Sequence, residues 1–181
     1  MLLSQQKFSL LSPNSNFLSF DCGDKDLNDF FMHDALLYKH ELLAVTYCFE
    51  DTNGKILSFF SVSNDSLADN DFEKWNSLSR KIKNQKRRRD YPAVKIGRIG
   101  VHKDCQGQNF GGQVLDFIKG WFAFNNKTGC RFVLVDAYNT PEVIHFYEKN
   151  DFATITIKDE NKKTRLMYFD LMKLNNIKNP V

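Results

Sequence analysis

With 181 residues, 42% of them hydrophobic and 26% charged, the chain is long enough to bury a core as one domain, and its composition excludes an intrinsically disordered protein. The formal net charge of +3 is too small for overall charge alone to indicate a polyanion binder. Seventeen Phe residues are many for this length and indicate a core or a ligand groove lined by aromatic rings.

The cysteines and the N-terminal residues indicate a cellular compartment. The four cysteines are far apart and form no C-x-x-C pair; they are Cys22, Cys48, Cys105 and Cys130. The opening residues lack the basic start and long apolar stretch of a secretion signal, and no window approaches the roughly 18 apolar residues of a membrane helix. We expect a reduced cytoplasmic protein with unpaired thiols.

The first half of the chain predicts a helix followed by a hairpin. Apolar residues at helical spacing between Phe20 and His40 follow Asp24, a plausible N-cap, and predict an amphipathic helix. Two β-type runs, 42–50 and 55–63, flank an Asn-Gly pair that favours a hairpin turn. The polar stretch after residue 64 predicts a short helix and then a loop.

The next segments alternate strand and helix. A strand is expected at about 93–101, and the apolar face within 111–124 predicts a helix. Residues 131–137 are nearly all apolar and predict a strand buried on both faces. Pro141 lies in the first turn of a short helix that is expected to extend to Asn150.

The C-terminal part predicts a second hairpin. Its strands are expected at 152–158 and 165–171, around a polar turn. The order of elements predicts an α/β or α+β fold, a sheet with helices on its faces. We expect a single domain over residues 1–174 and a polar C-terminal tail over 175–181.

The segment Ile99–Leu115 (IGVHKDCQGQNFGGQVL) runs from a predicted strand through a glycine-rich loop into a helix. Backbone N–H groups at a helix start are unpaired, and the helix dipole favours an anion there. Neither Lys nor Ser or Thr follows Gly111-Gly112, which excludes a P-loop, and the spacing does not fit the dinucleotide motif G-x-G-x-x-G.

A third interpretation is the pyrophosphate turn of acyl-CoA-dependent transferases, with the pattern [Q/R]-x-x-G-x-[G/A]. The chain matches it at Gln106 and Gly111 and departs from it at Asn109, where glycine is usual. Asn tolerates left-handed backbone angles, so the turn can survive the change. The alternative is a glycine-containing helix start that binds no ligand.

A second pattern lies about thirty residues further on. Val133–Asn139 (VLVDAYN) is followed by a segment with the residues FYEK-N-D-F, in which Asp151 stands where glycine is common. Together the two patterns resemble the GNAT N-acetyltransferase superfamily. Phe20–Phe30 resembles the F-x-C-G-x-x-x-L-x-x-F opening of a branch that includes toxins acetylating aminoacyl-tRNA, and Pro92–Val101 resembles that branch's strand ahead of the turn.

The resemblance implies a mixed, mostly antiparallel sheet with a V-shaped splay, helices on both faces, and acetyl-CoA as cosubstrate without a metal. The CoA arm would lie in the gap of the splay, with pantetheine on the backbone of Ile99 and Val101 and with Asn139 in contact with the arm. The N–H groups expected to hold the pyrophosphate are those of Gln106, Gly107, Gln108, Asn109, Phe110, Gly111 and Gly112.

The resemblance also assigns Tyr147 as the general acid that protonates the departing thiolate. The central strand 95–100 offers no Glu as a general base, so the amine would arrive neutral or lose its proton through water. His102 and His145 are not assigned this role. Cys105 has no His or carboxylate partner at motif spacing, and direct transfer needs no covalent step.

The sequence does not identify the acceptor and leaves three classes of function open. The basic run Arg80–Arg89 holds seven Lys or Arg residues and no acidic one, and it fits either a solvated loop or a tRNA backbone contact. The default is an N-acetyltransferase acting on a primary amine. A toxin-type enzyme acetylating aminoacyl-tRNA and a catalytically silent acyl-CoA-binding module are the alternatives. Relatives of this kind often form homodimers.

Overall fold

The computed structural model describes residues 1–68, 82, 89–124, 126, 128–156 and 158–174. The chain divides into two compact units, each assembled from two stretches: residues 1–63 with 96–118, and residues 64–95 with 119–181. The predicted tail 175–181 lies outside the described residues, so the predicted domain boundary stays a prediction. No helix within the described ranges is long and apolar enough to cross a membrane.

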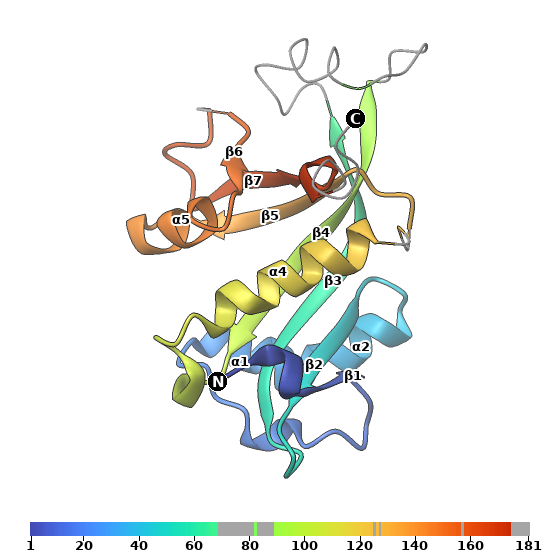
Figure 1. Ribbon diagram of the computed structural model, residues 1–181, viewed down its shortest axis with the longest axis vertical. Coiled ribbons are helices and arrows are strands. Elements are labelled where there is room, and N and C mark those ends of the chain that lie inside the picture. The colour runs from blue at the N-terminus through green and yellow to red at the C-terminus, as the bar shows by residue number, and fades with distance from the viewer. Residues whose placement is uncertain (69–81, 83–88, 125, 127, 157, 175–181) are drawn as a thin grey trace. The chain divides into compact units, whose positions relative to one another are not determined.

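The first unit contains the N-terminal helices and the first strands (Figure 1). Its elements in chain order are η1 (Leu3–Gln5), β1 (Lys7–Leu10), η2 (Phe17–Ser19), α1 (Lys25–Asp29), the π-helical turn η3 (Phe30–Asp34), α2 (Ala35–His40), β2 (Val45–Glu50) and the first part of β3 (Ile56–Ala68). The end of β4 (Asp90–Val101), η5 (Lys103–Cys105) and the first turns of α4 (Phe110–Ala123) complete it.

The predicted helix between Phe20 and His40 is present, and Asp24 caps it. The Asp24 carboxylate accepts a hydrogen bond from the Leu27 N–H at 3.1 Å, which satisfies one of the unpaired donors of the first turn. The π-helical turn η3 interrupts the helix and carries the buried Phe30 and Phe31. The wider turn was not predicted.

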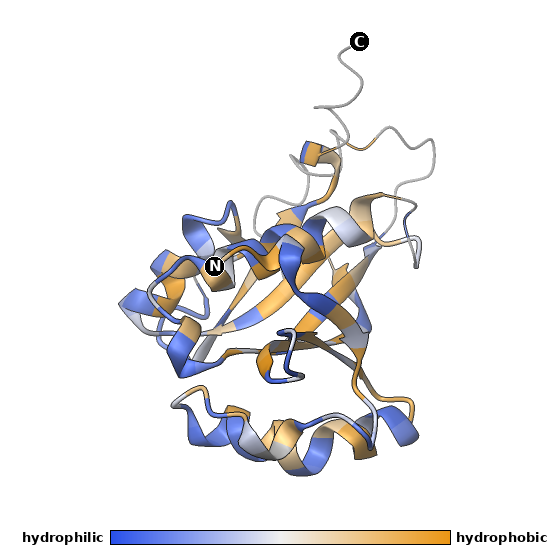
Figure 2. Cartoon of the chain, turned by 60° about the horizontal axis from the view of Figure 1, so that its bottom comes forward, coloured by the Kyte–Doolittle hydropathy of each residue, from blue (hydrophilic) through white to orange (hydrophobic). Residues whose placement is uncertain are grey.

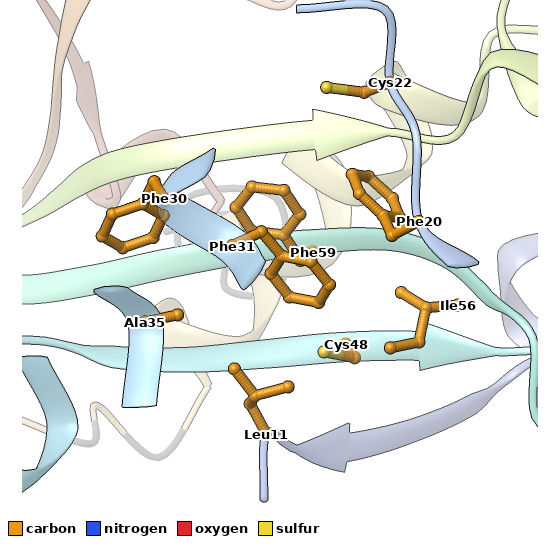
Figure 3. Packing of buried hydrophobic residues seen from close by; sticks show 9 residues of the cluster. All are labelled: Leu11, Phe20, Cys22, Phe30, Phe31, Ala35, Cys48, Ile56 and Phe59. Atoms are coloured by element: carbon orange, nitrogen blue, oxygen red, sulfur yellow. The ribbon is translucent and has the colours of Figure 1, made fainter. Parts of the chain in front are cut away.

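Helices cover both faces of the strands in this unit. The Phe31 ring stacks on Phe59 of β3, with centroids 4.3 Å apart (Figure 3). The neighbouring Phe60 faces the other way: it and Phe49 of β2 pack near Phe117 of α4, at centroid distances of 6.4 and 5.0 Å. Because side chains alternate along a strand, adjacent Phe residues anchor helices on opposite faces, as predicted.

The close packing around Phe59 requires glycine at position 100. A Cβ on Gly100 would lie 2.6 Å from the Phe59 ring, which is fully buried and held by Phe31. We expect Gly100→Ala to lower the free energy of unfolding by about 1–3 kcal/mol. Gly97→Ala, where the nearest atom is 3.9 Å away, is the matched control and should stay within about 0.5 kcal/mol. Equal denaturant midpoints for the two variants would contradict this packing.

The second unit contains the rest of β3, β4 and α4, together with the C-terminal elements. These are β5 (Phe132–Tyr138), α5 (Pro141–Glu148), β6 (Ala153–Thr154) and β7 (Thr164–Asp170). Its core is built from the buried residues Leu67, Tyr91, Ala93, Phe132, Leu134 and Ile155. Next to this core, the Lys95 ammonium lies 2.6 Å from Asp136 and 3.7 Å from Asp65.

The strands form one seven-stranded sheet in the order β1-β2-β3-β4-β5-β7-β6. The pairs β1–β2, β2–β3, β5–β7 and β6–β7 are antiparallel. Figure 2 shows mostly hydrophobic strands and helices that mix hydrophilic with hydrophobic residues. The predicted fold class, a mostly antiparallel sheet with helices, is confirmed; the V-shaped splay stays a prediction.

The structure differs from the predicted elements at the strand ends. β3 continues to Ala68, beyond the end predicted at residue 63, and β6 contains only two residues. Most of the segment in which a short helix and a loop were expected, residues 69–81 and 83–88, lies outside the described residues. The short length of β6 has a local cause, because the Asp159 carboxylate accepts the Leu166 N–H at 2.8 Å and the Arg165 Nε–H at 3.3 Å. A side chain thus takes the place of a strand partner there. The edge strand β1 was not predicted.

Candidate functional site

The predicted pyrophosphate turn lies between η5 and α4 and has the backbone conformation that its motif requires. Gly107 and Asn109 both adopt left-handed angles, with φ of 74° and 56°. Asn109 therefore takes the conformation of the glycine that it replaces. The Gln113 N–H donates to the Asn109 carbonyl at 3.2 Å and opens the helical ladder, so the N–H groups of 110–112 precede it.

Two side chains of the turn, those of Gln106 and Phe110, are directed into the protein. The Gln106 amide donates to the Val101 carbonyl at 2.9 Å and to the Cys22 carbonyl at 2.7 Å, and Phe110 is buried. Gln106 thus fastens the turn to the end of β4 and to the segment before α1. The Gln106 N–H also donates to the Lys103 carbonyl, at 3.3 Å, so the structure does not leave this predicted donor for the pyrophosphate. The groups left for an anion are the backbone N–H groups of residues 107–112, which is the kind of contact that the motif predicts.

Two lysines beside the turn are paired with carboxylates. Lys55 lies 2.7 Å from Asp104 and Lys103 lies 2.9 Å from Asp21. Hydrogen bonds from these ammonium groups hold the pKa of both carboxyls below the usual range. The surroundings of the turn are therefore charged but locally balanced.

His102 and Cys105 are occupied structurally. His102 is buried, and its Nδ1 accepts the Asp104 N–H at 3.2 Å, which makes it the cap of η5. Burial raises the pKa of the Cys105 thiol, which disfavours the reactive thiolate. Neither residue has the environment of a catalytic base or nucleophile.

Ile99 and Val101, the residues predicted to bind pantetheine, lie half-buried at the end of β4. The Val101 carbonyl accepts the Gln106 amide, and a carbonyl oxygen has a second lone pair for another donor. Their contact with a cofactor stays a prediction.

Asn139 follows β5 in the second unit and holds the connection between β6 and β7. Its side-chain amide nitrogen donates to the carbonyls of Glu160 and Lys162 at 2.6 and 2.9 Å, and its backbone N–H donates to Lys163 at 3.1 Å. Both amide hydrogens are thus used, and a contact with the CoA arm is left to Oδ1. The predicted contact stays a prediction.

Tyr147, the predicted general acid, lies on α5 and is only 4% exposed. Its ring packs edge-on against Phe146 and Phe152, with centroids 5.1 and 5.5 Å away. Burial raises the pKa of Tyr147 far above that of an ordinary phenol. The hydroxyl is therefore protonated at neutral pH, the state in which a general acid acts.

The turn after α5 resembles the turn before α4 in one respect. Asp151, which stands where glycine is common, has a left-handed φ of 65°. The N–H groups of Asn150 and Phe152 both donate to the Tyr147 carbonyl, at 3.0 and 3.1 Å. Both departures from the motifs thus preserve the left-handed backbone.

His145 is exposed on the same helix, α5, and most of the basic run Arg80–Arg89 lies outside the described residues.

The left-handed angle at Asn109 predicts a difference between two substitutions. Asn109→Ala should lower the free energy of unfolding by about 1 kcal/mol, because a Cβ without a compensating polar group disfavours this angle. Asn109→Gly should retain the stability of the wild type. Chemical denaturation of both variants checks this, and an Ala variant as stable as the Gly variant would show that the angle is not required.

The comparisons with known proteins bear on both groups of residues. Residues 78–154 match the family model described as "Acetyltransferase (GNAT) domain", a stretch that includes the turn, α4, β5 and α5. The match assigns this stretch to a known class of domain, the GNAT acetyltransferases. Residues 78–154 therefore contain a GNAT acetyltransferase domain, as the resemblance of the motifs predicted, and the prediction of an acyl-CoA-dependent enzyme is confirmed at the level of this domain.

Solved structures with the same fold include structures of the toxin AtaT. AtaT complexed with acetyl-methionyl-tRNAfMet matches with a TM-score of 0.80 at 16% identity, over 96% of this chain and 99% of that one. AtaTR bound with AcCoA gives a TM-score of 0.76 at 14% identity, over 97% and 99%. A tyrosine-to-phenylalanine variant of AtaT bound to the C-terminus of the antitoxin AtaR gives 0.73 at 15% identity, over 97% and 98%.

Proposed function

We propose that this enzyme transfers the acetyl group of acetyl-CoA to the amino group of an aminoacyl-tRNA. The single observation that supports the cosubstrate most is the turn 106–112, which combines two left-handed residues with backbone N–H groups, at the start of α4, that precede the first hydrogen bond of the helix. The fold shared with AtaT, a protein solved with acetyl-methionyl-tRNAfMet, supports the acceptor.

In the proposed complex, the N–H groups of residues 107–112 bind the pyrophosphate of CoA, and the backbone of Ile99 and Val101 pairs with pantetheine. The dipole of α4 adds to the attraction, because its N-terminal end carries partial positive charge. The lysines beside the turn contribute little, since each is already paired with a carboxylate.

The proposed reaction is a direct transfer. The amine nitrogen attacks the thioester carbonyl, the new C–N bond forms, and the C–S bond breaks. The thiolate of CoA takes the proton of the Tyr147 hydroxyl, and the phenolate is reprotonated through water by the proton that the amine loses. An α-amino group has a pKa of about 7.7–8.0, so a sizeable fraction is neutral near pH 7 without a dedicated base.

The acceptor proposal makes use of the basic run Arg80–Arg89, whose charge favours phosphate contacts without reading bases. The four buried, unpaired cysteines support a reducing compartment such as the cytoplasm, where charged tRNA occurs. The AtaR complex supports an antitoxin as a protein partner. A primary amine on a small molecule or a protein remains the second candidate, favoured by the breadth of the superfamily.

The first test is calorimetric titration with acetyl-CoA, free CoA and ATP. The proposal expects micromolar binding of acetyl-CoA and CoA and much weaker binding of ATP. Charged and uncharged initiator tRNA and a panel of small amines then serve as acceptors. Acetylation of charged tRNA that weakens steeply with salt supports the proposal. Turnover of small amines alone rejects the tRNA acceptor, and CoA binding without any turnover indicates the silent module.

A further inference from the structure

The turn that ends α5 is capped by two lysines from different elements. Lys119 of α4 donates to the Asn150 carbonyl at 3.2 Å, and Lys173 donates to the next carbonyl, that of Asp151, at 3.3 Å. Both ammonium groups also lie over the Phe169 ring, 4.9 and 5.2 Å from its centroid. The two lysines differ in exposure, because Lys119 is only 4% exposed and Lys173 is exposed.

A buried lysine at position 119 needs a physical reason. It lies on α4 beside the fully buried Ile118, within the apolar pattern of that helix, where an aliphatic side chain would avoid the cost of desolvating an ammonium group. The carbonyl at a helix end and the face of an aromatic ring both attract a cation. Lys119 contacts such a carbonyl, that of Asn150, and such a ring, that of Phe169.

These two contacts of Lys119 lead to Tyr147. The Asn150 carbonyl accepts from Lys119, and the Asn150 backbone N–H donates to the Tyr147 carbonyl at 3.0 Å. The side-chain amide of Asn150 donates to the Phe146 carbonyl at 2.7 Å. On the ring side, Phe169 packs on Phe152 at 5.8 Å, and Phe152 packs on the Tyr147 ring at 5.5 Å. The ammonium group therefore joins the backbone turn and the ring stack that support the tyrosine.

We propose that Lys119 is a positioning residue that holds the Tyr147 ring, and through it the acidic hydroxyl, in its reactive orientation. The proposal rests on the proposed role of Tyr147 as general acid. Lys119 itself transfers no proton and touches no substrate. Its action is mechanical: it fixes the turn 149–152 to α4, so that the phenol cannot rotate with the end of α5.

Lys119→Met keeps the aliphatic stem and removes the donor. We expect kcat to fall about tenfold while KM for acetyl-CoA stays unchanged, because a misplaced acid slows the chemical step and not binding. Lys173→Met, which removes the exposed cap of the same turn, is the matched control and should change kcat by less than about twofold, since water replaces an exposed donor. Lys119→Arg should recover part of the lost activity by restoring the donor.

A double-variant cycle separates positioning from general stability. Adding Lys119→Met to Tyr147→Phe should produce no further loss of kcat, because the group that Lys119 orients is already absent. A loss of the same size in both backgrounds would overturn the proposal. If Tyr147→Phe alone keeps the kcat of the wild type, the acid role fails, and the cycle shows this separately.

A second measurement needs no acceptor and no turnover. The difference in tyrosinate absorbance between the wild type and Tyr147→Phe isolates the ionisation of Tyr147 among the six tyrosines. In the Lys119→Met background, the same difference should appear at lower pH, because a loosened ring admits water to the hydroxyl. An unchanged ionisation curve would show that Lys119 does not hold the ring.

Discussion

Tyr147→Phe is expected to lower kcat about 100-fold or more and to leave the dissociation constant of acetyl-CoA within about twofold of the wild type. The reason is that the thiolate of CoA loses its proton donor, while the packing of the ring against Phe146 and Phe152 is retained. Single-turnover kinetics measure the first quantity and calorimetry measures the second.

Tyr168→Phe is the matched control for Tyr147→Phe, because Tyr168 is a half-buried phenol on β7 that packs against the core of the second unit. Its kcat should equal that of the wild type. A large loss of acetyl-CoA affinity in Tyr147→Phe, with little loss of kcat, would show that Tyr147 is mainly structural.

The burial of Tyr147 also predicts a pH dependence. Its pKa is raised above that of an ordinary phenol, so the protonated, active form persists through neutral pH and is lost only as pH rises through the raised pKa. We therefore expect no fall of kcat from this group below about pH 10. A fall of kcat at a lower pH in the wild type that is absent in Tyr147→Phe would contradict the burial of the hydroxyl.

Gly111→Glu is expected to weaken the binding of acetyl-CoA about 100-fold and to leave the stability of the fold close to that of the wild type. The new carboxylate would lie at the start of α4, where it repels a diphosphate but is compatible with the helix dipole. Calorimetric titration measures the affinity, and thermal unfolding measures the stability.

The uncharged variant Gly111→Gln separates charge from bulk. If the N–H groups of the turn hold the pyrophosphate, the Gln variant should bind acetyl-CoA at least about tenfold more tightly than the Glu variant, since only the latter adds repulsion. Equal affinities of the two variants would mean that the side chain merely blocks space, and unchanged affinity of both would reject the turn as the phosphate site.

Local signals carried most of the successful predictions. The Asp24 cap, the hairpin before β3, helix α4 and the short helix with Tyr147 each depend on residues within a few positions of one another. The left-handed angle of Asn109 was also predictable, because the motif requires a glycine-like residue there and Asn is the next best choice.

The contacts that were missed join distant parts of the chain. Gln106 binds the carbonyl of Cys22, 84 positions away, and Lys119 binds that of Asn150, 31 positions away. The amide of Asn139 reaches over 21 positions to Glu160. Such partners become neighbours only after folding, so periodicity and turn chemistry give no sign of them, and a residue's place in a motif does not reveal which of its atoms are already in use.

The hydrogen bonds of the Gln106 side chain within the protein limit what can be inferred from the presence of this residue in the motif. The first position of the pattern is Gln or Arg, two long side chains that both carry N–H donors. In this protein the side-chain amide of Gln106 donates to the carbonyls of Val101 and Cys22. A relative that has lost its cosubstrate would still need the same internal fastening. Gln or Arg at this position of a distant homologue therefore indicates that the fold around the turn is intact. Only the backbone conformation of the residues after it can indicate that the homologue still binds its cosubstrate.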